Sequence, residues 1–348
     1  MKTSIVRCGL VAPSVTGIPD SRPAGWLAVL LLALTLTVPG VLRGDGAPSG
    51  APASTPSPRA ANAVTTSPWG RIVMVGASAT AGFTESEPLG GPTTPHYRLS
   101  LYLDAAIRVA HEPVLNLANS MFFVEPESAG RYQVQQALEA RPTVVVGVDF
   151  LFWFCYGEGR TDQERLQRFA KGLKLLEAVQ CPLILGDLPD ASAATNDILS
   201  AEEIPSGTAL AAANRRLKEW AADRRQVTVV SLSGFMRAVL ANQALTVHGR
   251  TLPVGKTRTL LQDDKLHPSP AGSAVLALVV LDAIQSTRFA PSAGDVCWDP
   301  REVYRLGFNP SQDSAGRTSP GPHDSAGSTE GGDGSVPTIH HRTTHIEH

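Results

Sequence analysis

The stretch "RIVMVGASATAGF" (71–83) decides the fold class. Its first half is a short apolar run rich in β-branched residues, which is typical of a strand buried on both faces of a parallel sheet. A glycine and several small residues follow at once, and Ser78 stands among them. The stretch therefore predicts a strand, a sharp turn and a serine at the strand's carboxyl end. Alone, it does not separate a nucleophile from a helix cap or a phosphate-binding turn.

Similar strand-like runs recur along the chain, and stretches with helical periodicity separate them. The further strand-like runs are 113–118, 142–150, 181–187 and 226–232. The helical stretches are 96–111, 162–180, 208–225 and 269–285. This alternation predicts an α/β fold, a three-layer α/β/α sandwich around a mostly parallel sheet of about five strands. In such sheets the functional site lies at the carboxyl ends of the strands, where Ser78 is expected.

The two ends of the 348-residue chain differ in composition from its middle. Residues 1–44 hold an uncharged apolar stretch behind basic residues, which predicts a signal peptide or a single membrane anchor. The protein is therefore expected to be exported: secreted, periplasmic or anchored by this N-terminal segment. Residues 45–68 are rich in Pro, Ala, Ser and Gly and predict a disordered linker. The α/β domain is expected at 69–290, and an irregular extension with a disordered tail at 291–348.

Composition argues against several classes of function. A formal net charge of −2 offers no basic field for nucleic acid. There is no glycine-rich nucleotide-binding motif and no C-x-x-C pair, so neither a nucleotide, a metal nor another cofactor is expected. In an exported protein Cys155 and Cys181 could form a disulfide, and the sequence leaves that pairing open.

A second motif, "QDDKLHPSPAG" (262–272), precedes the last helical stretch. An Asp three residues before a His can set its carboxylate against the imidazole Nδ1–H, which leaves Nε2 free to take a proton. Asp264 and His267 have this spacing, and Asp263 is the alternative acid. The other interpretation of the motif is a solvated acidic loop before a helix. The topology brings the motif to the same rim as Ser78, which favours a nucleophile, a base and an orienting acid.

A serine nucleophile needs hydrogen-bond donors for the developing oxyanion. The main-chain N–H of Ser78 is one candidate. The turn after the second strand, "NLANS" (116–120), offers a second donor at Ala118. The third strand ends in "GVDFLFWF" (147–154) at the same rim, where the aromatic residues either wall an acyl pocket or belong to the core.

Four blocks, in this order, resemble the sequence blocks of the SGNH/GDSL hydrolase (esterase/lipase) family. They are "VMVGASATAGF" (73–83), "LNLANS" (115–120), "VVVGVDF" (144–150) and "DDKLHPSPAG" (263–272). The resemblance implies a flavodoxin-like α/β/α fold with a Ser-His-Asp site that acts on acyl esters of lipids, carbohydrates or small molecules, without a metal. Ser78 matches the family's nucleophile, His267 the base and Asp264 its orienting acid.

The chain departs from the family pattern at three positions. Ala77 replaces the Asp of the Gly-Asp-Ser block, and Ala118 stands where the oxyanion-hole glycine is usual. Asp149 replaces the asparagine that donates a hydrogen bond, and an ionised carboxylate cannot donate. Either Asp149 is protonated or another donor serves, with Asn116 and Asn119 as candidates. The predicted oxyanion hole is therefore Ser78 and Ala118, with Asp149 or Asn119 as the third member.

The sequence thus predicts a serine esterase that works through an acyl-enzyme. Two alternatives stay open: an acyltransferase with the same triad, and a catalytically weak or inactive binding protein on this fold. The acyl group, the leaving group and the oligomeric state are not readable from the sequence.

Overall fold

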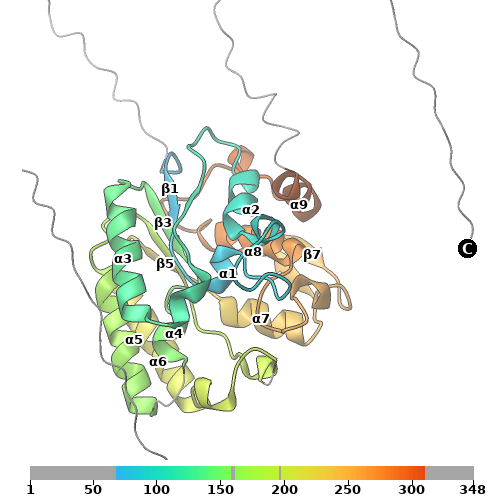
Figure 1. The fold of residues 1–348 in the computed structure, drawn as a ribbon. Helices are drawn as coiled ribbons and strands as arrows, with labels where there is room; N and C mark the ends of the chain where they lie inside the picture. Colours follow the sequence, from blue (N-terminus) through green and yellow to red (C-terminus); the bar gives the residue numbers. More distant parts are fainter. Residues whose placement is uncertain (1–67, 158–160, 196, 310–348) are drawn as a thin grey trace, which may run out of the picture. The chain divides into compact units, whose positions relative to one another are not determined.

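The computed structural model describes residues 68–157, 161–195 and 197–309. In this part of the chain five strands form one sheet in the order β2-β1-β3-β4-β5, and every neighbouring pair is parallel (Figure 1). The strands are β1 Ile72–Met74, β2 Leu115–Asn116, β3 Val144–Gly147, β4 Leu183–Gly186 and β5 Val227–Val230. This order is flavodoxin-like, so the predicted fold class is confirmed.

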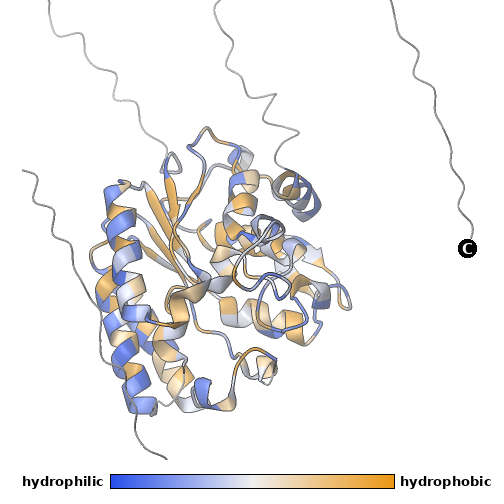
Figure 2. Ribbon diagram, viewed as in Figure 1, coloured by the Kyte–Doolittle hydropathy of each residue, from blue (hydrophilic) through white to orange (hydrophobic). Residues whose placement is uncertain are grey.

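The central strands β1, β3 and β4 are buried on both faces because they hold only apolar residues and glycine. Ile72 and Met74 of β1 belong to one core cluster, whereas Val73 and Val75 belong to the other. This alternation follows from the period of two along a strand. Figure 2 shows the strands in the hydrophobic colour between helices whose outer faces are hydrophilic.

Helices cover each face of the sheet. The first cluster is covered by α2 Leu99–Ala106, α7 Leu232–Leu240, α8 Pro270–Ala283 and α9 Pro300–Phe308. The second is covered by α3 Pro126–Glu139, α5 Asp162–Leu176 and α6 Gly207–Ala222. Two single-turn helices follow strands, α1 Ser78–Ala81 and α4 Phe152–Cys155. Short 3₁₀ turns are η1 Thr94–Tyr97, η2 Ser120–Phe123, η3 Ser192–Ala194, η4 Ala201–Glu203, η5 Arg258–Leu260 and η6 Ala293–Asp295.

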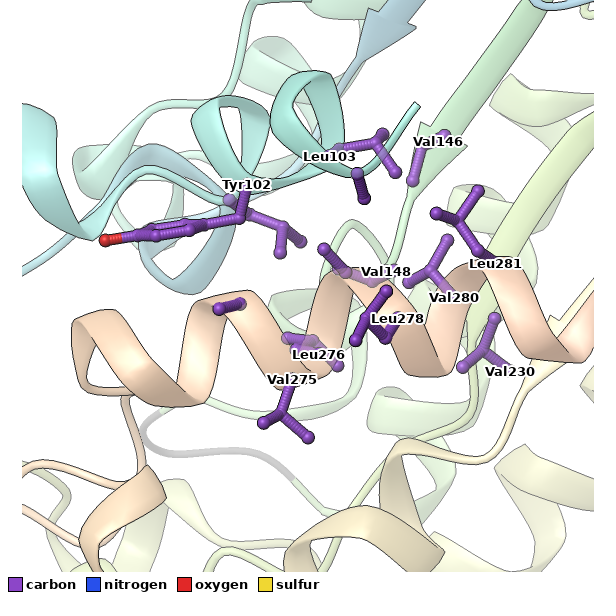
Figure 3. Close-up of a cluster of buried hydrophobic side chains, with 14 of the residues drawn as sticks. Tyr102, Leu103, Val146, Val148, Val230, Val275, Leu276, Leu278, Val280 and Leu281 are labelled. Atoms are coloured by element: carbon purple, nitrogen blue, oxygen red, sulfur yellow. The ribbon is translucent and has the colours of Figure 1, made fainter. Parts of the chain in front are cut away.

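Helix α8 is apolar around most of its circumference because it lies between the sheet and other helices. In the close-up of Figure 3 Leu281 of α8 lies beside Val146 of β3, and both belong to the same core cluster as Leu278 and Leu103. Ser269 caps this helix by accepting a hydrogen bond from the Gly272 N–H.

The domain extends beyond the boundary expected at residue 290. Helix α9 buries Val303 completely, and Cys297 N–H donates to the Ala106 carbonyl oxygen. Ile107, expected inside a helix, is instead extended and forms a β-bridge with Val296. The extension at 291–308 is therefore not irregular: it packs on the end of α2. Its few apolar residues gave no periodicity strong enough to reveal this.

Besides α9, the longer elements that have no counterpart among the expected ranges lie before β3 or after β5 in sequence. They are α3, α7 and an antiparallel hairpin of β6 Leu245–Val247 and β7 Arg250–Leu252. Cys155 and Cys181 are free thiols, because Cys155 lies beyond the carboxyl end of β3 and Cys181 precedes the opposite end of β4. Burial raises the pKa of the Cys155 thiol to about 12.

The predicted leader, the linker as far as residue 67 and the tail after residue 309 lie outside the described residues. The apolar stretch 25–42 is therefore not part of the structure described. Of the helices in the described ranges, none has the length and apolar character needed to cross a membrane.

Candidate active site

Ser78 lies at the first position of α1, directly beyond the carboxyl end of β1. The turn between them depends on Gly76, whose φ of 153° is rarely adopted by residues with a side chain. A Cβ at Gly76 would stand 2.1 Å from Asp149 Oδ1. The glycine therefore lets the end of β3 approach the nucleophile turn. Because β1 and β3 flank the point where the sheet winds in opposite directions, ligands are expected here.

Side chains from other elements hold this turn in place. Asp149 Oδ1 accepts hydrogen bonds from the Ala77 N–H at 3.0 Å and from the Thr80 hydroxyl at 2.6 Å, and Oδ2 accepts from the Thr80 N–H at 3.0 Å. Gln133 of α3 accepts from the Gly76 N–H at 2.8 Å and donates to the Gly76 carbonyl oxygen at 2.9 Å. The turn is thus fixed by contacts from residues far away in sequence.

The loop that carries the histidine is held mainly by its own residues. The Gln262 N–H donates to the His267 carbonyl oxygen, and Asp264 Oδ1 accepts from the N–H groups of Leu266 and His267, each at 2.9 Å. Lys265 takes a left-handed conformation, with φ of 59°, to close the turn. These bonds fix the Asp264 carboxylate beside the imidazole of His267.

A hydrogen-bonded chain joins the two parts. His267 Nδ1 lies 2.6 Å from Asp264 Oδ2, and His267 Nε2 lies 2.7 Å from Ser78 Oγ. Asp264 is 1% exposed and His267 is 3% exposed, so water screens their interaction little. Asp263, the alternative acid, is exposed to solvent. The structure therefore brings Ser78, His267 and Asp264 together in the order predicted.

The charge state of Asp264 is set by opposing effects. Burial acts to raise the pKa of its carboxyl group. The hydrogen bond and the charge attraction from His267, with the main-chain N–H groups of His267 and Leu266, outweigh burial and hold that pKa below its usual range. An ionised Asp264 favours the tautomer in which Nδ1 carries the proton and Nε2 accepts the serine proton.

Two further contacts tie the histidine loop to the nucleophile turn. Gln262 Nε2 donates to the Phe83 carbonyl oxygen at 2.8 Å, and the Phe83 ring lies against the imidazole of His267 with centroids 4.2 Å apart. Phe83 follows the left-handed Gly82 that ends α1. Neither Gln262, Phe83, Thr80 nor Gln133 was identified from the sequence, because each acts through a contact that local spacing does not encode.

The predicted oxyanion donors are only partly assembled. Asp149 accepts hydrogen bonds from main-chain N–H groups, which can only donate, so its carboxylate is directed at the turn and does not serve as a donor there. The Ala118 N–H donates to Asn116 Oδ1 at 3.0 Å. Asn119 Oδ1 accepts from the Met121 N–H at 2.8 Å, a bond that leaves the Nδ2 of Asn119 able to donate. Asn116 Nδ2 donates hydrogen bonds to the Thr80 carbonyl oxygen and to Ser100 Oγ, so it is not available to an oxyanion.

The main-chain N–H of Ser78 differs from that of Ala118, because it has no hydrogen-bond acceptor within the described residues. Ser78 is thus the one member of the predicted oxyanion hole with a main-chain donor that is free beside the hydroxyl.

Two spaces meet at Ser78. The inner cavity, of about 60 Å³, lies on the side of β4, α7 and α8, and Phe152 and Asp187 are among its lining residues. The outer groove, of about 360 Å³, lies on the other side, and Trp153 is among its lining residues. Phe154 is a core residue. Asp187 accepts hydrogen bonds from the N–H and the hydroxyl of Ser233, so it holds the first turn of α7 as well as lining the cavity.

Within residues 68–157, 161–195 and 197–309, no group of three or more His, Cys, Asp or Glu side chains is arranged to hold a metal ion. The terminal histidines of the chain lie outside these ranges.

No protein-family model and no curated protein matches the chain. Among solved structures, a lipase/acylhydrolase from Enterococcus faecalis is 17% identical, with a TM-score of 0.43, covering 66% of this chain and 98% of its own. A catalytic mutant of an acetylxylan esterase from Geobacillus stearothermophilus is 18% identical, with a TM-score of 0.41, covering 64% and 97%. A GDSL-like lipase from Bacteroides thetaiotaomicron is 15% identical, with a TM-score of 0.34, covering 60% and 83%. Similarity at this level carries no argument about activity, which has to be inferred from this chain's own residues.

Proposed function

We propose that the protein is a serine esterase of the SGNH/GDSL type that hydrolyses an acyl ester through an acyl-enzyme. The observation that carries the proposal is the chain from Ser78 Oγ through His267 to Asp264, with hydrogen bonds of 2.7 and 2.6 Å. Such a chain makes a serine hydroxyl nucleophilic, because the imidazole can take its proton as the new bond forms.

In the proposed mechanism Ser78 Oγ attacks the ester carbonyl carbon, and its proton passes to His267 Nε2. The tetrahedral intermediate collapses, the bond to the alcohol oxygen breaks, and the imidazolium gives its proton to the leaving alcohol. A water molecule then attacks the acyl-enzyme, with His267 again taking the proton and returning it to Ser78 Oγ. Asp264 stabilises each transient imidazolium charge.

The developing oxyanion is assigned to the main-chain N–H of Ser78. Asp149 occupies the N–H groups of Ala77 and Thr80, so it orders the start of α1 without supplying a donor itself. Each missing oxyanion-hole donor costs on the order of a hundredfold to a thousandfold in rate. We therefore expect turnover to be slow and most readily seen with activated esters.

The experiment compares wild type with Ser78→Ala, using an aryl ester and a fluorophosphonate probe that labels nucleophilic serines. Wild type should hydrolyse the ester and take up the probe, and Ser78→Ala should do neither while keeping its thermal unfolding transition. Ser86→Ala, an exposed serine outside both spaces, is the matched control and should behave as wild type. Unchanged hydrolysis by Ser78→Ala would refute the proposal.

The acceptor role of Asp149 also favours one alternative, a binding protein that keeps the fold with a depleted oxyanion hole. In that case intact wild type would resist the probe and bind esters without turnover. An acyltransferase would instead react with the probe and pass the acyl group to an added polyol.

We further propose that the protein is exported. The support is the uncharged apolar stretch at 25–42 behind basic residues. The proposed partners are ester substrates of small-molecule, lipid or carbohydrate type.

A further inference from the structure

The two spaces beside Ser78 differ sixfold in volume, about 60 Å³ for the inner cavity and about 360 Å³ for the outer groove. Ser78, Leu266 and His267 line both, so the reacting atoms lie where the two spaces meet. An ester bound at Ser78 has two halves, the acyl group and the alcohol. The two spaces can therefore each receive one half of the ester.

The inner cavity is walled by packed apolar side chains. Leu232, Phe235 and Met236 come from α7, and Leu276 comes from α8. All four belong to the main core cluster, so the wall cannot yield without disturbing the packing of the sheet. A cavity of about 150 Å³ holds a benzene ring, so 60 Å³ admits only a group of about two to four carbon atoms.

The charged side chains of the inner cavity are already satisfied. Asp149 is bonded to the nucleophile turn, and Asp187 accepts two hydrogen bonds from Ser233. Neither side chain needs a hydrogen bond from a ligand, and both would repel a negatively charged group in the cavity. The cavity therefore suits a small uncharged acyl group and disfavours a dicarboxylic one.

The outer groove is larger and opens to solvent. Its rim carries apolar side chains that are unusually exposed, with Leu89 at 86%, Phe123 at 45% and Met121 at 44%. The buried Trp153 forms part of its wall, and its ring centroid lies 5.5 Å from that of Phe123. A bulky, largely apolar group would cover this surface.

The order of the two chemical steps indicates which half of the ester occupies which space. The acyl group stays bonded to Ser78 until water attacks, whereas the alcohol must leave first and water must enter where it was. The exchange of alcohol for water needs the open side. The acyl group can remain among the buried side chains throughout.

We infer that the substrates are esters of a short, uncharged acid, from acetyl to butyryl, with a bulky and largely apolar alcohol. This inference rests on the proposed esterase function. In the first step the Ser78 Oγ–acyl bond forms, the acyl–alcohol bond breaks, and the serine proton leaves with the alcohol through His267. In the second step water supplies the hydroxyl of the released acid and returns a proton to Ser78.

The test is a series of p-nitrophenyl esters from acetate to decanoate. For wild type, kcat/KM should be highest at acetate to butyrate and should fall at least tenfold by octanoate. Met236→Ala, which enlarges the inner cavity, should move the optimum to longer chains. Met121→Ala makes the same substitution in the outer groove, so it should keep the acyl-length profile while reducing the preference for 2-naphthyl acetate over ethyl acetate.

The outcomes separate this inference from the proposed function. Hydrolysis that peaks at octanoate or decanoate in wild type would overturn the short-acyl assignment while leaving the esterase standing. A folded Met236→Ala with an unchanged profile would overturn the role of the inner cavity. If that variant does not fold, the wild-type series still decides. No hydrolysis of any ester would overturn both.

Discussion

The nucleophile turn and the histidine loop are joined by the hydrogen bond between Ser78 Oγ and His267 Nε2 and by two contacts at Phe83, yet they are held in opposite ways. The histidine loop is largely self-contained: Asp264 accepts two hydrogen bonds from its own loop and one from the imidazole beside it. The nucleophile turn consists of small residues and takes its shape from Gln133 and Asp149, which lie 57 and 72 positions away from their partners at Gly76 and Ala77. The conformation of a self-contained loop can be predicted from its own sequence, whereas that of a turn shaped by distant residues cannot.

The largest effect is expected from Asp264→Asn, which changes one residue of the self-contained loop. The amide can still accept from the Leu266 and His267 N–H groups, but its Nδ2 would face Nδ1 and favour the wrong imidazole tautomer. We expect kcat on p-nitrophenyl acetate to fall about a thousandfold to ten-thousandfold with little loss of fold. Steady-state kinetics with a thermal melt measure both. A loss below tenfold would contradict the role of Asp264.

A smaller effect is expected from Asp149→Asn in the nucleophile turn. An amide cannot accept from both sides as the carboxylate does, so one bond to Ala77 or Thr80 is lost and Ser78 shifts. A misplacement of this kind costs about a hundredfold in kcat. Thr80→Val, which removes only the hydroxyl contact, should lose less, and its KM should change little.

An increase in kcat on Asp149→Asn would contradict this account. It would mean that the asparagine restores an oxyanion donor and that the carboxylate is not needed to hold the turn.

Stability should distinguish two glycines that share a positive φ. Gly76→Ala places a Cβ against Asp149, whereas Gly249→Ala meets no atom within 4 Å. We expect Gly76→Ala to lower the free energy of unfolding by about 1–3 kcal/mol more than Gly249→Ala, because overpacking adds to backbone strain. Urea denaturation of both variants measures the difference. Equal losses would show that the approach of Asp149 does not constrain the turn.

The subtlest expected effect is the pH dependence of stability at Asp264. Its folded pKa lies below the ordinary value of 3.8, so the ionised carboxylate stabilises the fold above about pH 3.8, and this stabilisation is lost as the pH falls through the folded pKa. The gap in unfolding free energy between wild type and Asp264→Asn should therefore be constant near neutral pH and shrink in acid. A gap that widened in acid would contradict the direction of the shift.

The same contrast explains how far the sequence could be interpreted. The five strands were predictable because each lies in a short run of mostly apolar residues. Asp264 and His267 were predictable because three positions separate them. The role of Gln133 could not be predicted, because its helix has few apolar positions and its contact with Gly76 forms only in the folded protein. The sequence showed that an ionised Asp149 cannot donate to an oxyanion. That it instead accepts hydrogen bonds from the nucleophile turn could not be predicted, because this approach depends on the absence of a Cβ at Gly76.

The central claim, that Ser78 carries the acyl group, can be tested directly by trapping the intermediate. The full-length protein is mixed with p-nitrophenyl acetate, quenched in acid during turnover, digested and examined by mass spectrometry. We predict an acetyl group on Ser78 in wild type, and none at this peptide in Ser78→Ala. Turnover that leaves Ser78 unmodified while another side chain carries the acetyl group would contradict the account.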